Sequence, residues 1–195
     1  MLCSGKGVAP GSATSLVGQF ALVSYIPEPL AGFLDRLRLE LTPGCKPHAH
    51  VTVLPPRPLE GELKETIQCL AAHCRDAASF TVRLGEVEVF PVSNVIYVNL
   101  CFGNDELRSM YRELNSGSLC CPERFPYHPH ITIGQHLSPE DVGDAAALAR
   151  KRWAEYRGPR EFQVETLTFV QQVAPEMWVD LAELPLMAAV LAGVR

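Results

Sequence analysis

Two stretches of this chain, HAHVTV at residues 48–53 and HPHITI at residues 128–133, share one pattern that decides how the fold is interpreted. Each places His, an apolar residue, Thr and a second apolar residue in succession. Side chains alternate between the two faces of a strand, so His and Thr share one face and the apolar pair packs on the other. The pattern predicts two short strands with matching His/Thr faces.

The paired His/Thr faces suit chemistry at a phosphate group. Imidazole titrates near neutral pH, so one of His50 and His130 can accept a proton while the other donates one. The hydroxyls of Thr52 and Thr132 can donate hydrogen bonds to phosphoryl oxygens, where negative charge accumulates. Two imidazoles and two hydroxyls are sufficient for in-line attack on a phosphodiester without a metal ion. Which imidazole is the acid and which the base stays open.

The rest of the chain alternates strand and helix patterns. Apolar spacing and helix-start signals predict helices over residues 30–41, 61–78, 105–114 and 138–156, the third with Asp105 as its N-cap. Strands are predicted over residues 19–26, 50–54, 80–89, 95–101, 130–133, 161–173 and 177–184. Because adjacent strand pairs occur among the helices, the order favours an α+β fold over a purely parallel sheet.

The overall charge limits the ligands. A formal charge of -5 at pH 7 argues against a protein that coats long nucleic acids through its overall charge. Residues 43–59 and 124–139, around the two motifs, contain no Asp or Glu, although the chain average would place about four there. No carboxylate nearby in sequence is therefore ready to neutralise an anion site.

The chain is long enough for one domain, and its apolar content of 47% can form a core. We expect that domain over residues 19–184, a flexible tail over 1–18 and a short helix or tail over 185–195. The longest apolar run, residues 186–194, is well short of the ~20 residues that span a bilayer. No secretory pattern and no Cys-x-x-Cys pair occurs, so we expect a cytoplasmic protein without a membrane partner.

The two motifs resemble those of the 2H phosphoesterase superfamily, which includes the LigT-like 2′-5′ RNA ligases and the 2′,3′-cyclic phosphodiesterases. The resemblance rests on HVTVLPPRPL at residues 50–59 and YHPHITIGQ at residues 127–135, and extends over roughly residues 19–184. It implies a bilobal LigT-like fold, with two pseudo-symmetric βα lobes and antiparallel sheets around a central cleft. It also implies metal-independent chemistry, with no cofactor, on 2′,3′-cyclic phosphates or 2′-5′ bonds of a small nucleotide or RNA end.

The same resemblance implies roles for single residues. His50 and His130 would be catalytic, and Thr52 and Thr132 would bind the phosphate. Some better-known members carry Arg directly after the second motif, where this chain has Gly134-Gln135.

Other residues near the motifs are candidates for binding the substrate. We predict that Arg57 supplies the basic phosphate contact, with Arg124 as a second source of positive charge. The remaining candidates for substrate contact are Tyr127, His128, Gln135 and His48.

Two alternatives remain open. The two His-x-His pairs, four imidazoles in all, could bind a transition metal in a metal-dependent hydrolase. A site altered at Gly134-Gln135 could bind a nucleotide or RNA end without turning it over. The oligomeric state is not indicated by any motif.

Overall fold

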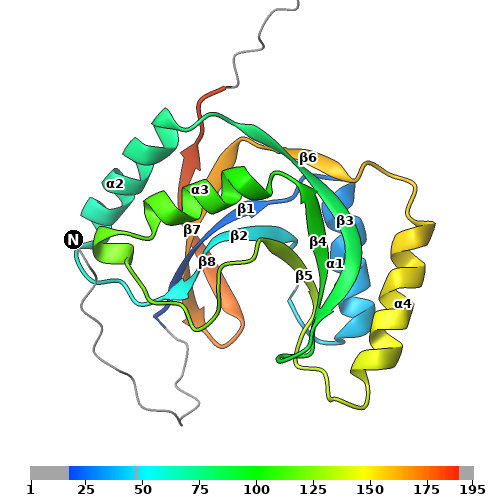
Figure 1. Cartoon of the computed structure of the whole chain (residues 1–195). Coiled ribbons are helices and arrows are strands. Elements are labelled where there is room, and N and C mark those ends of the chain that lie inside the picture. Colours follow the sequence, from blue (N-terminus) through cyan, green and yellow to red (C-terminus); the bar gives the residue numbers. More distant parts are fainter. Residues whose placement is uncertain (1–17, 47, 189–195) are drawn as a thin grey trace, which may run out of the picture.

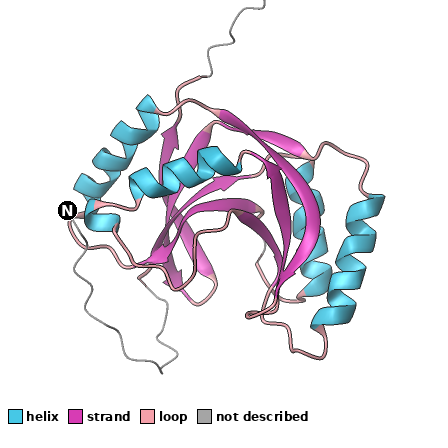
Figure 2. Ribbon diagram, viewed as in Figure 1, coloured by secondary structure: helices cyan, strands magenta, loops and turns pink. Residues whose placement is uncertain are grey.

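The computed structural model describes residues 18–46 and 48–188, which form two sheets with helices around them (Figures 1 and 2). The strands are β1 (Phe20–Tyr25), β2 (His50–Arg57), β3 (Phe80–Phe90), β4 (Val95–Phe102), β5 (His130–Gly134), β6 (Glu161–Val164), β7 (Thr166–Ala174) and β8 (Met177–Pro185). The helices are α1 (Leu30–Leu41), α2 (Leu63–Asp76), α3 (Asn104–Leu114) and α4 (Val142–Glu155), with a 3₁₀ turn at Gly117–Leu119.

Each sheet has four antiparallel strands and carries one motif on an outer strand. The first lobe has the strand order β2-β1-β7-β8 and the second lobe has the order β5-β4-β3-β6. The order β1-α1-β2-α2 of the first lobe is repeated as β4-α3-β5-α4, which relates the lobes by pseudo-symmetry. The edge strands β2 and β5 lie against each other. The predicted α+β fold with two lobes is confirmed.

The helices between the motif strands exchange partners across the lobes. Helix α1 of the first lobe packs on β5, and α3 of the second lobe packs on β2. The apolar residues of the motifs, Val51, Val53, Ile131 and Ile133, are at most 1% exposed and belong to one core cluster that spans both sheets. This burial removes the apolar face from water and leaves the His/Thr face on the other side of each strand.

The strand of the first motif is longer than predicted. We expected it to end before Pro55, but β2 continues through Pro55 and Pro56 to Arg57. A register shift in the β1–β2 pairing lies at this point, between the pairs of Phe20 and Leu22. Proline lacks the N–H of a ladder bond, so it is tolerated on an edge strand at a bulge.

The predicted strand over residues 161–173 is two strands in different sheets. Strand β6 pairs with β3 in the second lobe, whereas β7 pairs with β1 and β8 in the first lobe. Glu165 is the residue between them, so the chain passes there from one sheet to the other. An unbroken run of strand-forming residues carries no mark of such a crossing.

Two helix starts also differ from the prediction. Helix α3 follows Gly103, with φ of 89°, and no side chain caps it, so Asp105 lies in the first turn instead. A Cβ at position 103 would lie 2.6 Å from the Thr81 carbonyl oxygen, which explains the glycine. Helix α4 begins at Val142, because Ser138 forms a turn in which its hydroxyl bonds Asp141 at 2.6 Å.

The predicted tails lie mostly outside the described residues, which exclude 1–17, 47 and 189–195. The expected tail boundaries therefore stay predictions. Among the helices of the described residues, none combines the length and apolar character that crossing a membrane requires.

Candidate active site

The two motif histidines are held in the same way. Nδ1 of His50 lies 2.6 Å from the His48 carbonyl oxygen, and Nδ1 of His130 lies 2.7 Å from the His128 carbonyl oxygen. A carbonyl oxygen only accepts, so Nδ1 donates and Nε2 of each neutral ring keeps its lone pair. Each histidine therefore presents Nε2 as the nitrogen available for proton transfer.

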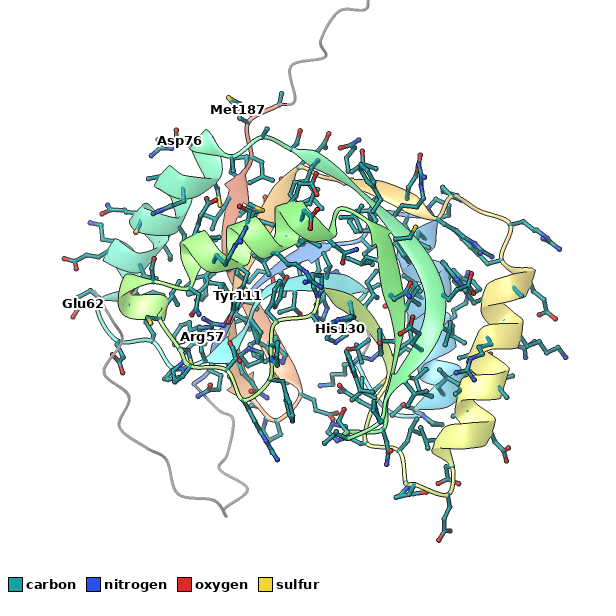
Figure 3. The ribbon with its side chains drawn as sticks, in the orientation of Figure 1. Arg57, Glu62, Asp76, Tyr111, His130 and Met187 are labelled. Atoms are coloured by element: carbon teal, nitrogen blue, oxygen red, sulfur yellow. The ribbon has the colours of Figure 1, made fainter. Side chains whose placement is uncertain are left out.

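The motif residues of both strands are partly exposed on the same side of their sheets. His50 and Thr52 are half-buried at the start of β2, and His130 and Thr132 are half-buried at the start of β5 (Figure 3 labels His130). Because β2 and β5 are neighbours in space, the structure brings the two predicted His/Thr pairs together.

Burial lowers the pKa of both histidines. The pKa of His50 falls to about 4, first because of desolvation and then because positive charge on Arg38, His48 and His130 disfavours a proton there. The pKa of His130 is lowered by desolvation and by His128. The main-chain hydrogen bond opposes the shift in each case. Both rings are therefore neutral near pH 7, and His50 interacts electrostatically with His130.

Aromatic rings lie edge-on to both motif histidines, two of them at His130 and one, Tyr25, at His50. Phe90 stacks on Tyr97 with ring centroids 4.0 Å apart, and the ring of His130 is edge-on to both. In the first lobe, Tyr25 stacks on His48 at 3.7 Å. These contacts restrict the ring orientations beside each catalytic candidate.

The fold brings carboxylates to the motifs that sequence proximity did not predict. Tyr97 donates a 2.8 Å hydrogen bond to Glu88, and Tyr25 donates a 2.6 Å hydrogen bond to Asp180. Asn99, opposite His130 in the β4–β5 pairing, also donates to Glu88. The acid-free stretches of sequence are thus not acid-free in space, since Glu88 and Asp180 come from β3 and β8.

The structure does not bring Arg57 to the motif histidines. Arg57 is 1% exposed and forms an ion pair at 2.5 Å with Glu123. Glu123 lies directly before the acid-free stretch of residues 124–139. In Figure 3, Arg57 lies beside Tyr111 of α3 and apart from His130. The guanidinium of Arg57 is enclosed by these partners and by Asn115 and Leu119, so in this structure it presents no open face to a phosphate.

The other predicted substrate contacts differ in their exposure and in the groups that they touch. Tyr127 is half-buried and its hydroxyl donates to the Thr52 carbonyl oxygen at 2.8 Å. His48 and His128 are exposed, and Gln135 is half-buried directly after β5. Arg124 is exposed with its guanidinium 5.1 Å from the ring centroid of Phe125.

The four histidines do not form a metal-binding group. Within residues 18–46 and 48–188, no three or more His, Cys, Asp or Glu side chains are placed to hold one metal ion. The Nδ1 atoms of His50 and His130 are already engaged by carbonyl oxygens. The geometry therefore does not fit the four-imidazole site that the motifs left open.

Two residues of α1 near the first motif were not found from the sequence. The positive charge of Arg38 acts on His50, and among the described residues its guanidinium forms no ion pair or side-chain hydrogen bond. Asp35 interacts with the Ala49 N–H, and burial raises the pKa of its carboxyl. Both residues lie between the apolar positions of α1, where the helical pattern predicts side chains that face solvent. The sequence pattern therefore does not indicate that they lie near His50.

A comparison with protein-family models decides the family. The model described as the 2′-5′ RNA ligase superfamily matches residues 26–176, most of the chain. The chain belongs to the 2′-5′ RNA ligase superfamily. The sequence resemblance of the two motifs to the 2H phosphoesterases is confirmed at the level of the family.

Relatives of this superfamily member agree with the assignment. It is 30% identical over 112 residues to a Bacillus anthracis protein named "Putative phosphoesterase", and the match covers 56% of this chain and 64% of that protein. The match thus spans less than two thirds of the relative's length.

Solved structures similar to this superfamily member share its fold. Apo LigT of E. coli has a TM-score of 0.60 at 18% identity, covering 87% of this chain and 98% of LigT. The protein TT0787 of Thermus thermophilus has a TM-score of 0.59 at 20% identity, covering 87% of this chain and 98% of that protein. The fold is LigT-like.

Proposed function

We propose that this protein is a metal-independent phosphoesterase that acts on 2′,3′-cyclic phosphates or 2′-5′ phosphodiester bonds. The observation that supports this most is the matched pair of histidines, each with Nδ1 bonded to the carbonyl two residues upstream and Nε2 left for proton transfer. Paired general acids and bases are what a phosphodiester needs when water or a hydroxyl attacks phosphorus and a ribose oxygen leaves.

We assign the base role in hydrolysis to His50. Burial lowers the pKa of both rings, but the permanent positive charge of Arg38 also disfavours a proton on His50, whereas no arginine or lysine is among the groups that lower the pKa of His130. Nε2 of His50 takes the proton of water as the water oxygen bonds phosphorus. Nε2 of protonated His130 gives its proton to the ribose oxygen as the P–O bond breaks. The roles exchange when the reaction runs toward bond formation.

The threonine hydroxyls and one arginine bind the phosphate in this proposal. Thr52 and Thr132 share the faces of the two histidines, so each can donate to a phosphoryl oxygen. We assign to Arg38 the phosphate contact predicted for Arg57, because the charge of Arg38 acts on His50 and its guanidinium forms no ion pair among the described residues, although that charge also acts on the Asp35 carboxylate. The negative charge of a bound phosphate favours protonation of a neighbouring imidazole, which is how His130, neutral in the free protein, acquires the proton that it donates.

Small nucleotides or RNA ends are the proposed substrates. E. coli LigT, which has the same fold, is described in complex with phosphate and with 3′-AMP. The family name refers to 2′-5′ bonds of RNA.

The test is a turnover assay in EDTA. Purified protein is incubated with each 2′,3′-cyclic nucleotide and with 2′-5′ dinucleotides, and the products are separated as 2′- or 3′-monophosphates. We expect hydrolysis that survives EDTA and disappears in the His50→Gln/His130→Gln double variant. Activity that is lost in EDTA and restored by zinc would instead support the metal-dependent hydrolase.

A binder without turnover is the remaining alternative. It would bind a cyclic nucleotide in calorimetry and leave it intact in the same assay. That result would overturn the enzyme proposal and keep the site.

A further inference from the structure

A hydrogen bond crosses between the lobes at the first motif. Strand β2 is the outer strand of its sheet, and the main-chain carbonyl of Thr52 accepts the Tyr127 hydroxyl at 2.8 Å. Tyr127 lies three residues before His130, in the segment that leads into β5. This contact therefore joins the middle of one motif to the start of the other.

The Tyr127 side chain is fixed in a single orientation. Its ring stacks on Tyr111 of α3 with centroids 4.2 Å apart and planes 8° from parallel. Burial raises the pKa of the Tyr127 phenol well above its usual range, so the hydroxyl stays protonated and remains a donor. Because α3 packs on β2, both lobes hold the ring that makes the bond.

Arg57 anchors the chain segment that leads to Tyr127. Its guanidinium donates to the Asn115 amide oxygen at 2.6 Å, to the Leu119 carbonyl oxygen at 2.8 Å and to the Glu123 carboxylate at 2.5 Å. The Asn115 amide oxygen also accepts the N–H of Cys121 at 2.9 Å. A residue at the end of β2 thus holds the loop that carries the second motif.

We propose that Arg57 and Tyr127 form an inter-lobe brace that sets the separation of His50 and His130. This inference rests on the proposed function, since the separation matters for chemistry only if both rings act on one phosphate. Tyr127 is then a positioning residue rather than the substrate contact first considered.

The brace has a measurable consequence for catalysis. In-line displacement places the two imidazoles on opposite sides of phosphorus, and a misplacement of about 1 Å can cost on the order of 100-fold in rate. Edge strands of separate sheets share no ladder bonds, so the distance between β2 and β5 depends on side-chain packing and on hydrogen bonds made by side chains. The Tyr127 hydroxyl supplies one such bond at the motif itself.

The test compares Tyr127→Phe with a matched Tyr156→Phe control. Tyr127→Phe keeps the stacked ring and removes only the bond to Thr52. Tyr156 also has a buried hydroxyl, and that hydroxyl has no hydrogen-bond partner among the residues that the structure describes. We expect Tyr127→Phe to lower kcat for a 2′,3′-cyclic nucleotide by about 10- to 100-fold, with KM within about threefold and the melting temperature lowered by only a few degrees. The control should keep wild-type kcat.

A second readout does not depend on turnover. The ring signals of His50 and His130 are followed by NMR during titration with inorganic phosphate and with acid. In the wild type the signals of both rings should change over the same range of phosphate concentration. During the acid titration, protonation of one ring should move the signal of the other. We expect this coupling to weaken in Tyr127→Phe and to persist in the control.

The outcomes separate the two proposals. Wild-type protein without turnover would remove the proposed enzyme function, and the brace would then be decided by the NMR coupling alone. Normal kcat in a folded Tyr127→Phe variant of an active enzyme would overturn the brace, as would unchanged coupling in an inactive one. Arg57→Lys keeps the charge but lacks the planar guanidinium, so it should also lower kcat and weaken the NMR coupling. If Arg57→Lys does not fold, the result for Tyr127→Phe alone decides whether the brace exists.

Discussion

In the first lobe, His50 starts β2 beside the charged side chains of α1, whereas in the second lobe His130 starts β5 against Phe90 and Tyr97. Both rings nevertheless make the same Nδ1 contact to a carbonyl oxygen. The feature common to both motifs is a histidine held in one tautomer. The surroundings of each histidine, charged in the first lobe and aromatic in the second, then adjust the proton affinity of its ring.

The residue between the paired histidines also differs between the lobes. Pro129 has a fixed φ and no N–H to satisfy. Ala49 has an N–H, which interacts with Asp35, and its carbonyl accepts the Ile26 N–H at 3.0 Å. A proline ring in one lobe and side-chain and main-chain contacts in the other thus hold equivalent carbonyl groups.

The largest expected effect comes from replacing one histidine at a time. His50→Gln and His130→Gln should each lower kcat/KM by about 10²–10⁴-fold, because each removes a general acid or base. A base must be unprotonated, so wild-type activity should fall as pH drops through the pKa of His50, and His50→Gln should lose that acidic limb. His130→Gln should lose the alkaline limb.

The control for these variants is His73→Gln, an exposed histidine of α2 that should leave the pH profile unchanged. Loss of the same limb in both motif variants would contradict the assignment of base and acid to different lobes.

The charge on α1 should matter for substrate binding. Arg38→Gln should raise KM for a cyclic nucleotide by about 10-fold, the range of a lost charge-assisted hydrogen bond. It should also raise the pKa of His50, since a nearby positive charge is removed, and so move the acidic limb to higher pH. Arg36→Gln on the exposed side of the same helix is the matched control, and an equal change in both variants would remove the special role of Arg38.

The lowered pKa of His50 should appear in the pH dependence of stability. Between the usual value of 6.5 and about 4, the unfolded state binds more protons than the folded state. The free energy of unfolding should therefore fall as pH drops through this window, by at most about 1.4 kcal/mol per pH unit from this group, and level off below it. Urea unfolding of wild type and His50→Gln should show a difference that shrinks toward low pH. A constant difference would contradict the shift.

The smallest effect is expected at the proline of the second motif. Pro129→Ala should lower the free energy of unfolding by about 0.4–1 kcal/mol, because the unfolded chain gains freedom. The loss in kcat should be smaller than that of Tyr127→Phe, since the His128 carbonyl remains in place. A loss of 100-fold would show that the proline itself fixes the geometry.

Local patterns predicted the elements that carry the motifs. The apolar spacing of α1 and the alternation in β2 and β5 placed these elements within a few residues, because each depends on neighbours in the chain. The faces of His50 and His130 followed from strand parity alone. These are the parts of the site that short-range geometry determines.

The rest of the site depends on partners that are distant in sequence. The sequence predicts a phosphate contact for Arg57 from its position after the first motif, and it gives no sign of the ion pair with Glu123, because that partner lies 66 residues away and only the fold brings the two together. Glu88 and Asp180 reach the motifs through sheet pairing, whereas Arg38 reaches His50 through the packing of α1 beside the motif strands. No window around a motif contains this information.

The crossing at Glu165 bears on how the chain folds as it is synthesised. All four strands of the second lobe lie between Phe80 and Val164, so that sheet can assemble once this segment has left the ribosome. Strand β1 of the first lobe must wait for β7, and until Thr166–Ala174 emerges it keeps an open edge that can pair with other chains. The sheet that carries the first motif histidine is thus the first to begin and the last to be completed.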